Sequence, residues 1–116
     1  MIVGIGIDVT QVSRFTEAAH RTPGLLDKIF TAAEHDTSMQ RMAGRFAAKE
    51  AFAKALGAPT GLVWTDVEVR KDEAGAPYFA CSGTVAALVA DRGIASIHLS
   101  ITHDAGIAAA VVVCES

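Results

Sequence analysis

The chain has few of the residues that would mark it as a secreted or membrane-embedded protein. Its only cysteines, Cys81 and Cys114, form no CxxC pair, so neither a disulfide framework nor a zinc site is expected. No apolar run is long enough to span a bilayer. The first residues include Asp8 and lack the basic region of a secretory leader. We therefore expect a cytoplasmic protein with reduced thiols.

An excess of positive charge is missing as well. Ten Lys and Arg residues against 13 Asp and Glu residues give a formal net charge of −3, which argues against general binding to nucleic acid. Any anionic substrate must therefore meet a local basic patch. The four histidines show no HExxH spacing, and the chain has no P-loop. Gly4-Ile5-Gly6 is not a dinucleotide fingerprint, because Val9 stands where the third glycine belongs.

What remains is an alanine-rich chain, 51% apolar, that suits one compact domain over residues 1–116. Thr31 and Glu34 have the form of a capping box. Ser82 suits the start of a helix, and Gly57 suits a helix end. The order of elements is typical of an α+β domain with a mainly antiparallel sheet packed on one long helix plus shorter helices. The hydrophobic pattern predicts strands at 1–8, 62–70, 78–81, 95–102 and 107–114, helices at 10–20, 40–56 and 83–92, and a short apolar piece at 25–30.

Two stripes run along the predicted long helix, at about 100° per residue. A carboxylate between two ammonium groups, on a face with little bulk, suits a metal ion together with phosphates, so this helix indicates an anionic ligand. The alternative is that Glu50 and Lys54 form an ordinary i,i+4 pair on a solvent-exposed face. The first stripe holds only small residues, Gly44, Ala47, Ala48, Ala51 and Ala55, and the second holds Phe46, Glu50, Ala53 and Gly57 between Lys49 and Lys54.

The first predicted strand is the expected partner of the small-residue stripe, and we expect it to be largely buried. Its alternation places Ile2, Gly4, Gly6 and Asp8 on one face and Val3, Ile5 and Ile7 on the other. Because the glycines remove side chains from the first face, the helix could approach closely and bring Asp8 near Glu50. Two such carboxylates favour a cation between them, and hard oxygen ligands favour Mg²⁺. Alternatively, Asp8 caps the helix that follows it.

His103 directly follows the predicted 95–102 strand, continues its face of Ile97, Leu99 and Ile101, and begins the turn at 103–106. Functional groups are often displayed at such a place. The alternative is a histidine with local hydrogen bonds only.

Three segments taken together resemble a known family. They are Gly-Ile-Gly-Ile-Asp at 4–8 with Arg14 after it, Arg-Phe-Ala-Ala-Lys-Glu-Ala-Phe-Ala-Lys-Ala-Leu-Gly at 45–57, and Ser-Ile-Thr-His-Asp at 100–104. In this order they resemble the holo-acyl-carrier-protein synthases, the small bacterial-type branch of the phosphopantetheinyl transferases. The resemblance covers nearly the whole chain and implies that family's fold.

The resemblance implies Mg²⁺-dependent transfer of 4′-phosphopantetheine from coenzyme A to a serine of apo-acyl carrier protein, with release of adenosine 3′,5′-bisphosphate. It leaves open whether the carrier protein serves fatty-acid or polyketide synthesis. A non-catalytic module that binds coenzyme A or a carrier protein is the alternative. A magnesium-dependent nucleotide hydrolase is a third possibility.

The resemblance also implies roles for individual residues. Asp8 and Glu50 match the family's magnesium ligands. Lys54 would offset charge on the leaving phosphate, and Glu50, a metal-bound water or the His103–Asp104 pair could accept the serine proton, with Glu50 or its water favoured. The residues that match the neighbourhood of the coenzyme A phosphates are Arg45, Phe46, Lys49, Lys54, Gly57 and His103.

Two partners follow from the same resemblance. Arg14, and less closely Arg21, match a basic first helix that meets the acidic carrier protein. The family forms homotrimers with active sites between neighbouring subunits.

Two features of this chain depart from the family pattern. Thr102-His103-Asp104 stands in place of the commoner Ser-His-Glu, and the connection at 30–44 is shorter than usual. The contacts that this connection makes to nucleotide or carrier protein therefore stay open.

Overall fold

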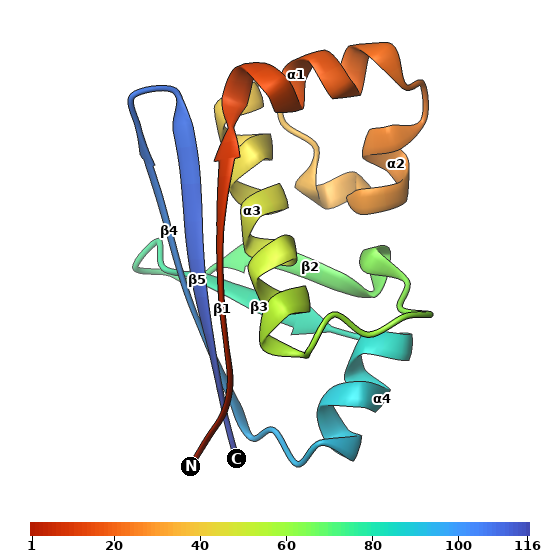
Figure 1. Cartoon of the computed structure of the whole chain (residues 1–116), viewed down its shortest axis with the longest axis vertical. Coiled ribbons are helices and arrows are strands. Elements are labelled where there is room, and N and C mark those ends of the chain that lie inside the picture. Colours follow the sequence, from red (N-terminus) through yellow and green to blue (C-terminus); the bar gives the residue numbers. More distant parts are fainter.

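A computed structural model describes all residues, 1–116, and confirms the α+β prediction. In chain order, its elements (Figure 1) are β1 (Ile2–Gln11), α1 (Val12–Arg21), α2 (Leu25–Ile29), the 3₁₀ turn η1 (Ala32–Glu34), α3 (Met39–Ala55), the 3₁₀ turn η2 (Trp64–Asp66), β2 (Val67–Lys71), β3 (Pro77–Cys81), α4 (Gly83–Asp91), β4 (Ser96–Asp104) and β5 (Ile107–Glu115).

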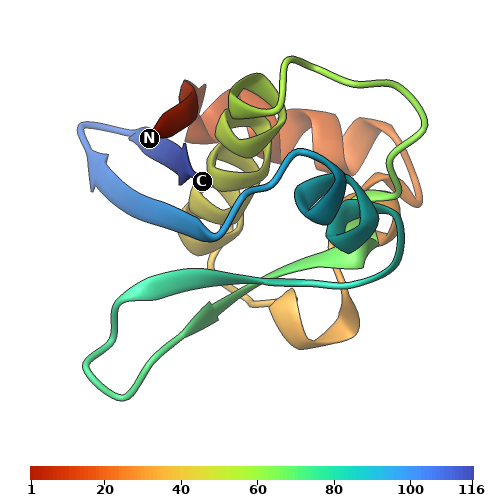
Figure 2. The same ribbon diagram turned by 90° about the horizontal axis from the view of Figure 1, so that it is seen from below.

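All strand pairs are antiparallel, in a three-stranded sheet ordered β1-β5-β4 and a separate β2-β3 hairpin. The turn between β4 and β5 holds only Ala105 and Gly106, both with positive φ, as a two-residue hairpin turn requires. Figure 2 shows α3 at the centre of the molecule, with the three-stranded sheet on one side and α4 on the other. None of the helices is both long enough and apolar enough to cross a membrane.

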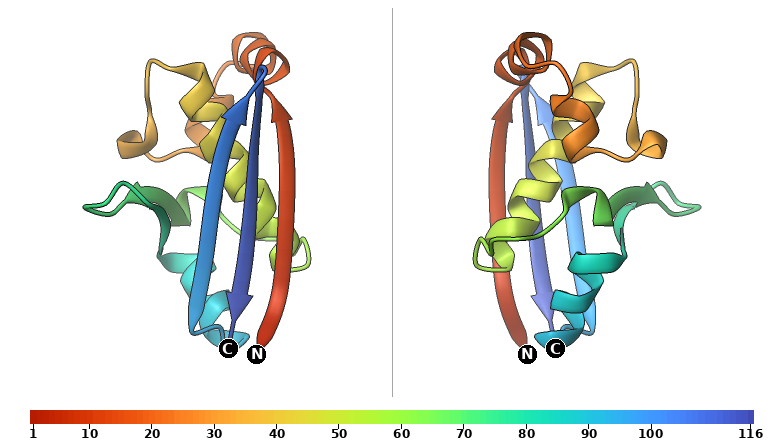
Figure 3. Two further views of the ribbon diagram at one scale, coloured as in Figure 1. Left: turned by 90° about the vertical axis from the view of Figure 1, so that its left-hand side faces the viewer. Right: turned by 90° about the vertical axis from the view of Figure 1, so that its right-hand side faces the viewer.

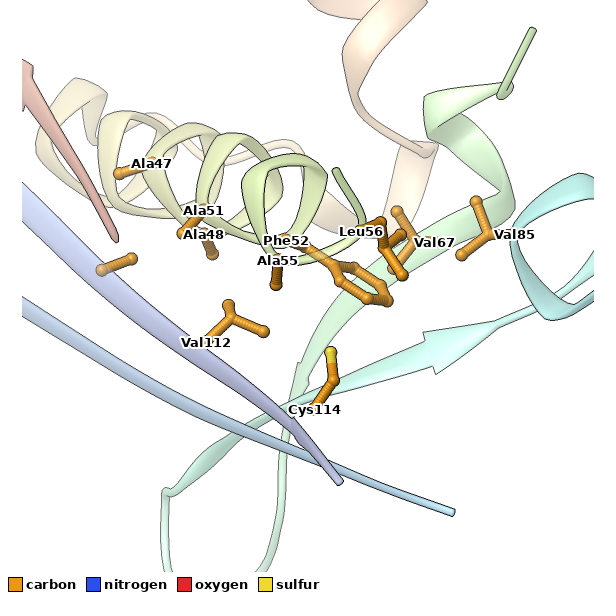
Figure 4. Close-up of a cluster of buried hydrophobic side chains, with 11 residues drawn as sticks. Ala47, Ala48, Ala51, Phe52, Ala55, Leu56, Val67, Val85, Val112 and Cys114 are labelled. Atoms are coloured by element: carbon orange, nitrogen blue, oxygen red, sulfur yellow. The ribbon is translucent and has the colours of Figure 1, made fainter. Parts of the chain in front are cut away.

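Helix α3 packs on β1 with almost no gap between the two backbones, as the paired glycines and alanines predict. A Cβ atom added at Gly4 would lie 2.0 Å from the carbonyl oxygen of Ala55, and one at Gly6 would lie 1.7 Å from that of Ala51. Both positions therefore admit only glycine. Figure 4 shows the buried cluster that results, in which Ala47, Ala48, Ala51, Phe52 and Ala55 of α3 meet Val112 and Cys114 of β5.

The prediction that β1 is largely buried is wrong for one of its faces. The helices lie on one side of the three-stranded sheet, and the other side is uncovered (Figure 3). Along β1 the uncovered face is apolar: Val3, Ile5, Ile7 and Val9 are 46%, 61%, 62% and 62% exposed. Alternation shows only which residues share a face, not which element covers that face. We call this face the outer face of the sheet.

Three local predictions are also corrected. The strand predicted at 62–70 begins only at Val67, because Asp66 binds the start of α4 instead of pairing with a strand: its carboxylate accepts the backbone N–H and the hydroxyl of Thr84, both at 2.8 Å. Ser82 makes no side-chain cap for α4, so Asp66 serves that helix start instead. Asp8 caps no helix, because β1 continues to Gln11 before α1 begins.

The capping-box prediction at Thr31 and Glu34 is confirmed. The Glu34 carboxylate accepts the backbone N–H of Thr31 at 2.9 Å, as that motif requires. The hydroxyl of Thr31 turns to Glu68 of β2, to which it donates at 2.9 Å. The short 30–44 connection is thereby tied to β2.

Candidate functional site

Two clefts flank α3, and together they contain most of the predicted site residues. The first, of about 420 Å³, is lined by both candidate metal ligands and is called here the carboxylate cleft. The second, of about 550 Å³, is lined by five basic side chains and is called the basic cleft. The carboxylate cleft is bounded by β1, α1, α2 and α3, and its charged residues are Asp8, Arg14, Arg21 and Glu50. The charged residues of the basic cleft, together with its histidine, are Arg41, Arg45, Glu68, Arg70, Lys71 and His103.

Asp8 is held in place by two neighbours at the edge of the carboxylate cleft. Its Oδ2 accepts the hydroxyl of Thr10 at 2.9 Å, and its Oδ1 lies 3.3 Å from the Lys54 ammonium. Lys54 also donates to the carbonyl oxygen of Ile7 at 2.9 Å. Thr10 was not predicted as a site residue, although its place two positions after Asp8 puts both side chains on one strand face. The packing of β1 on α3 thus places the Asp8 carboxylate beside the Lys54 ammonium, a pairing that was not predicted.

Glu50 lines the same cleft and responds to Asp8 electrostatically. Partial loss of hydration raises the pKa of Glu50 above its ordinary value, repulsion from Asp8 raises it further, and Lys54 opposes both effects. Asp8 and Glu50 therefore line one cleft and are close enough to interact electrostatically. A carboxylate that resists ionisation beside another carboxylate is stabilised by a cation between them.

These residues fit a magnesium ion that keeps part of its hydration. The protein has no group of three or more His, Cys, Asp or Glu side chains placed to hold a metal, so a site at Asp8 and Glu50 would offer only these two carboxylates as protein ligands. Mg²⁺ is commonly bound by one or two carboxylates together with water and substrate phosphates. Two hard oxygen donors in an open cleft satisfy that requirement.

The basic cleft lies between α3, the β2-β3 hairpin and β4. Arg45 lies 3.8 Å from Asp36 and donates to the carbonyl oxygen of Glu34, which fixes its guanidinium at the cleft wall. His103 packs over Gly44, because a Cβ atom added at Gly44 would lie 2.5 Å from Nε2 of His103. The absence of a side chain at Gly44 thus gives His103 its place in the cleft. Sequence reasoning grouped Gly44 only with the small residues that pack on β1.

Lys49 does not face either cleft, so its predicted contact with phosphates is wrong. Its side chain is only 2% exposed, and its ammonium donates to the carbonyl oxygens of Ile29 and Trp64 and to the carboxylate of Glu34. An ammonium group has three donors, and all three are used. Burial lowers the pKa of Lys49, and the bond to Glu34 opposes this shift.

The remaining predicted residues fall into two groups. Arg14, Arg21 and Phe46 line the carboxylate cleft, whereas Gly57 lines neither cleft and ends α3 with a φ of 79°. Sequence reasoning missed five polar residues that line the basic cleft, Arg41, Glu68, Arg70, Lys71 and Tyr78. Arg70 could have been proposed from the sequence, because the alternation in 62–70 places it on the polar face of the predicted strand.

Comparison with known proteins agrees with this geometry. A family model described as the 4′-phosphopantetheinyl transferase superfamily matches residues 4–112. The chain is 54% identical over 121 residues to a holo-[acyl-carrier-protein] synthase of Salinispora arenicola, covering 99% of both chains. It is 53% identical over 115 residues to that of Clavibacter michiganensis, covering 99% of this chain and 97% of the relative.

Solved structures agree as well. A holo-[acyl-carrier-protein] synthase from Neisseria meningitidis superposes with a TM-score of 0.89 at 29% identity and covers both chains fully. The Helicobacter pylori synthase in complex with coenzyme A superposes with a TM-score of 0.84 at 32% identity, covering 96% of this chain and 99% of that one.

The chain therefore belongs to the 4′-phosphopantetheinyl transferase superfamily. Within that superfamily, the relatives that match it over nearly their whole length are holo-[acyl-carrier-protein] synthases, which confirms the resemblance of the three sequence segments.

Proposed function

We propose that this chain transfers the 4′-phosphopantetheine group of coenzyme A to a serine of apo-acyl carrier protein and releases adenosine 3′,5′-bisphosphate. The observation that carries the proposal is the convergence of Asp8, Glu50 and Lys54 where β1 meets α3. Its relatives are holo-[acyl-carrier-protein] synthases, and the similar synthases of solved structure include complexes with coenzyme A.

Asp8 and Glu50 would hold Mg²⁺ in the carboxylate cleft. When bound, this ion would neutralise the pyrophosphate of coenzyme A and polarise the phosphorus that is attacked. Thr10 and Lys54 fix the direction of the Asp8 carboxylate through their contacts of 2.9 and 3.3 Å. These two contacts would keep the Asp8 carboxylate in one orientation while the ligand binds.

Phosphoryl transfer needs charge neutralisation and alignment more than covalent help from the protein. The serine oxygen forms the new bond to phosphorus, its proton passes to a base, and the bond to the leaving phosphate breaks. Glu50 is the base that we favour, because its carboxylate lines the cleft that the serine would enter. Lys54, 55% exposed at the side chain, is close enough to Asp8 to offset charge on the leaving phosphate.

The basic cleft would bind the remaining phosphate charge of coenzyme A. Arg45 and His103 are the residues of this cleft that match the family pattern, and Arg41, Arg70 and Lys71 add positive charge. Arginine suits this role because its planar group can hold two phosphate oxygens at once.

An assembly of three chains with active sites between neighbours would explain two features of the fold. The outer face of the sheet is apolar and uncovered along β1, and Ile107 and Val111 of β5, 41% and 37% exposed, extend it. Exposed apolar surface of this kind commonly marks a contact between proteins. The residues matched to one site are also divided between two clefts of a single chain, which a neighbouring copy could combine.

The acyl carrier protein would dock at the mouth of the carboxylate cleft. Arg14 and Arg21 are exposed there, beside the apolar side chains of Leu25 and Ile29. Basic side chains around an apolar centre suit an acidic protein partner. The serine of that partner would then enter the cleft that contains Glu50.

Intact-protein mass spectrometry tests the proposal. Apo-acyl carrier protein incubated with this chain, coenzyme A and Mg²⁺ is expected to gain the mass of one phosphopantetheine group, and a chelator is expected to abolish the gain. No gain with several carrier proteins, although the folded chain binds coenzyme A, would favour a non-catalytic binding module. Loss of coenzyme A without any acceptor protein would favour a hydrolase.

A further inference from the structure

A buried ion pair lies inside the protein between the two clefts. Lys49 is 2% exposed and Glu34 is 1% exposed, and the Lys49 Nζ lies 2.7 Å from Glu34 Oε1. The other two Lys49 contacts are to the carbonyl oxygens of Ile29, at 2.6 Å, and Trp64, at 3.0 Å. Lys49 therefore joins the end of α2 and the turn before β2 to the middle of α3.

Glu34 ties the same region together from the other side. Its Oε1 also accepts the backbone N–H of Thr31 at 2.9 Å, and its Oε2 accepts that of Val69 at 2.8 Å. No buried polar side-chain atom in the protein lacks a partner. The pair is thus a fully satisfied network that joins residues 29–34, α3 and β2.

The segments that this network joins are walls of both clefts. Val69 lines the basic cleft, and Ile29 lines the carboxylate cleft. Arg45 of the basic cleft donates to the carbonyl oxygen of Glu34, and Glu50 of the carboxylate cleft directly follows Lys49 in the chain. The pair bonds directly to Arg45 and Val69, so a shift at the pair would displace the wall of the basic cleft most.

Stability alone does not account for such a pair, because well-packed apolar side chains of similar volume are often as stabilising as a buried ion pair. We propose that Lys49 and Glu34 are positioning residues that hold the basic cleft in the shape that binds coenzyme A. The inference rests on the proposed function, since it takes coenzyme A as the ligand. Neither residue touches the substrate; both act through Arg45 and the wall that contains Val69.

The test is a comparison of KM and kcat. Lys49→Met keeps the length of the side chain and removes the charge and the three donors. We expect KM for coenzyme A to rise about tenfold, because small displacements of binding groups have effects of this size or larger. We expect kcat at saturating coenzyme A to change less than about threefold, since the groups at the reacting phosphorus remain in place.

A matched control separates positioning from loss of stability. Val85 of α4 is fully buried and lines neither cleft, so Val85→Ala destabilises the fold without touching the network. At a temperature at which both variants are folded, Val85→Ala should keep the wild-type KM for coenzyme A. A raised KM in both variants, or in neither, would overturn the proposal.

Glu34→Gln is the second variant. It keeps the side-chain volume and one acceptor but weakens the bonds to Lys49 and to the two backbone amides, so KM for coenzyme A should rise in the same direction. Should Lys49→Met fail to fold, Glu34→Gln decides the question. Failure of both variants to fold would show a purely structural pair and would also overturn the proposal.

Failure of the proposed function is a separate result. If the wild-type chain transfers nothing, the proposed function is overturned, and the dissociation constant of coenzyme A measured by calorimetry takes the place of KM. Unchanged coenzyme A affinity in folded Lys49→Met and Glu34→Gln, or no affinity in the wild type, would then overturn the positioning role.

Discussion

Two lysines on one helix have opposite surroundings. Lys54 pairs with Asp8 at 3.3 Å and is 55% exposed at its side chain, whereas Lys49 pairs with Glu34 at 2.7 Å and is 2% exposed. The exposed pair lies where a charged ligand can approach it, and the buried pair has no donor left for a ligand. The comparison teaches that exposure and unused hydrogen-bonding capacity, not residue type, separate a candidate reactive pair from a positioning pair.

The largest expected effect concerns the acids beside the exposed pair. Glu50→Gln and Asp8→Asn each remove one of the two carboxylates proposed to hold Mg²⁺. We expect the rate of phosphopantetheine transfer to fall about a thousandfold, by analogy with the loss of other preorganised charge-stabilising groups. Mass spectrometry of the carrier protein over time measures the rate. Wild-type rates in both variants would show that this cleft is not the reactive site.

Removal of the buried lysine should lower stability, beside its expected effect on KM. Lys49→Met leaves the Glu34 carboxylate buried without its partner, so we expect the free energy of unfolding to fall by about 3–5 kcal/mol. Urea unfolding followed by circular dichroism measures this change. The double variant Lys49→Met/Glu34→Gln should recover part of the loss, because no unpaired charge then remains. A double variant less stable than Lys49→Met would contradict this account.

The matched change at Lys54 should lower the transfer rate strongly and the free energy of unfolding only slightly. Lys54→Met removes an ammonium at the edge of the carboxylate cleft, so we expect transfer to fall about a hundredfold. The free energy of unfolding should change by less than about 1 kcal/mol, as for other exposed ion pairs. The same kinetic and urea assays apply. Equal stability losses in Lys54→Met and Lys49→Met would remove the distinction between the pairs.

The smallest effect concerns pH. Because the folded chain raises the pKa of Glu50 above its ordinary value of 4.5, the native state binds more protons than the unfolded state just above that pH. This group's contribution therefore lowers stability as pH rises through the window between the ordinary and the raised pKa. In Mg²⁺-free buffer, urea midpoints of Glu50→Gln should lack this decrease. Identical pH profiles for wild type and variant would contradict the raised pKa.

The close approach of β1 and α3 was predictable because it depends on local pattern. Gly4 and Gly6 alternate on one strand face, and the small residues of α3 recur at helical spacing, so two short segments suffice to indicate contact. The convergence of Asp8 with Glu50 follows from that packing. The absence of a strand at 62–66 was not predictable, because it depends on the hydrogen bond between Asp66 and Thr84, which lies 18 residues away in the sequence.

By itself, the sequence determined the α+β class, the family, the close contact of β1 with α3, and the two carboxylates that this contact brings together. Only the tertiary structure decided which lysine is buried, because that depends on residues 29–34 and 64–69 closing over one side of α3. It also decided that the apolar outer face of β1 is uncovered, and that His103 and Arg45 line a different cleft from Glu50. Periodicity assigns a residue to a face, but burial and charge pairing depend on which distant segments pack there.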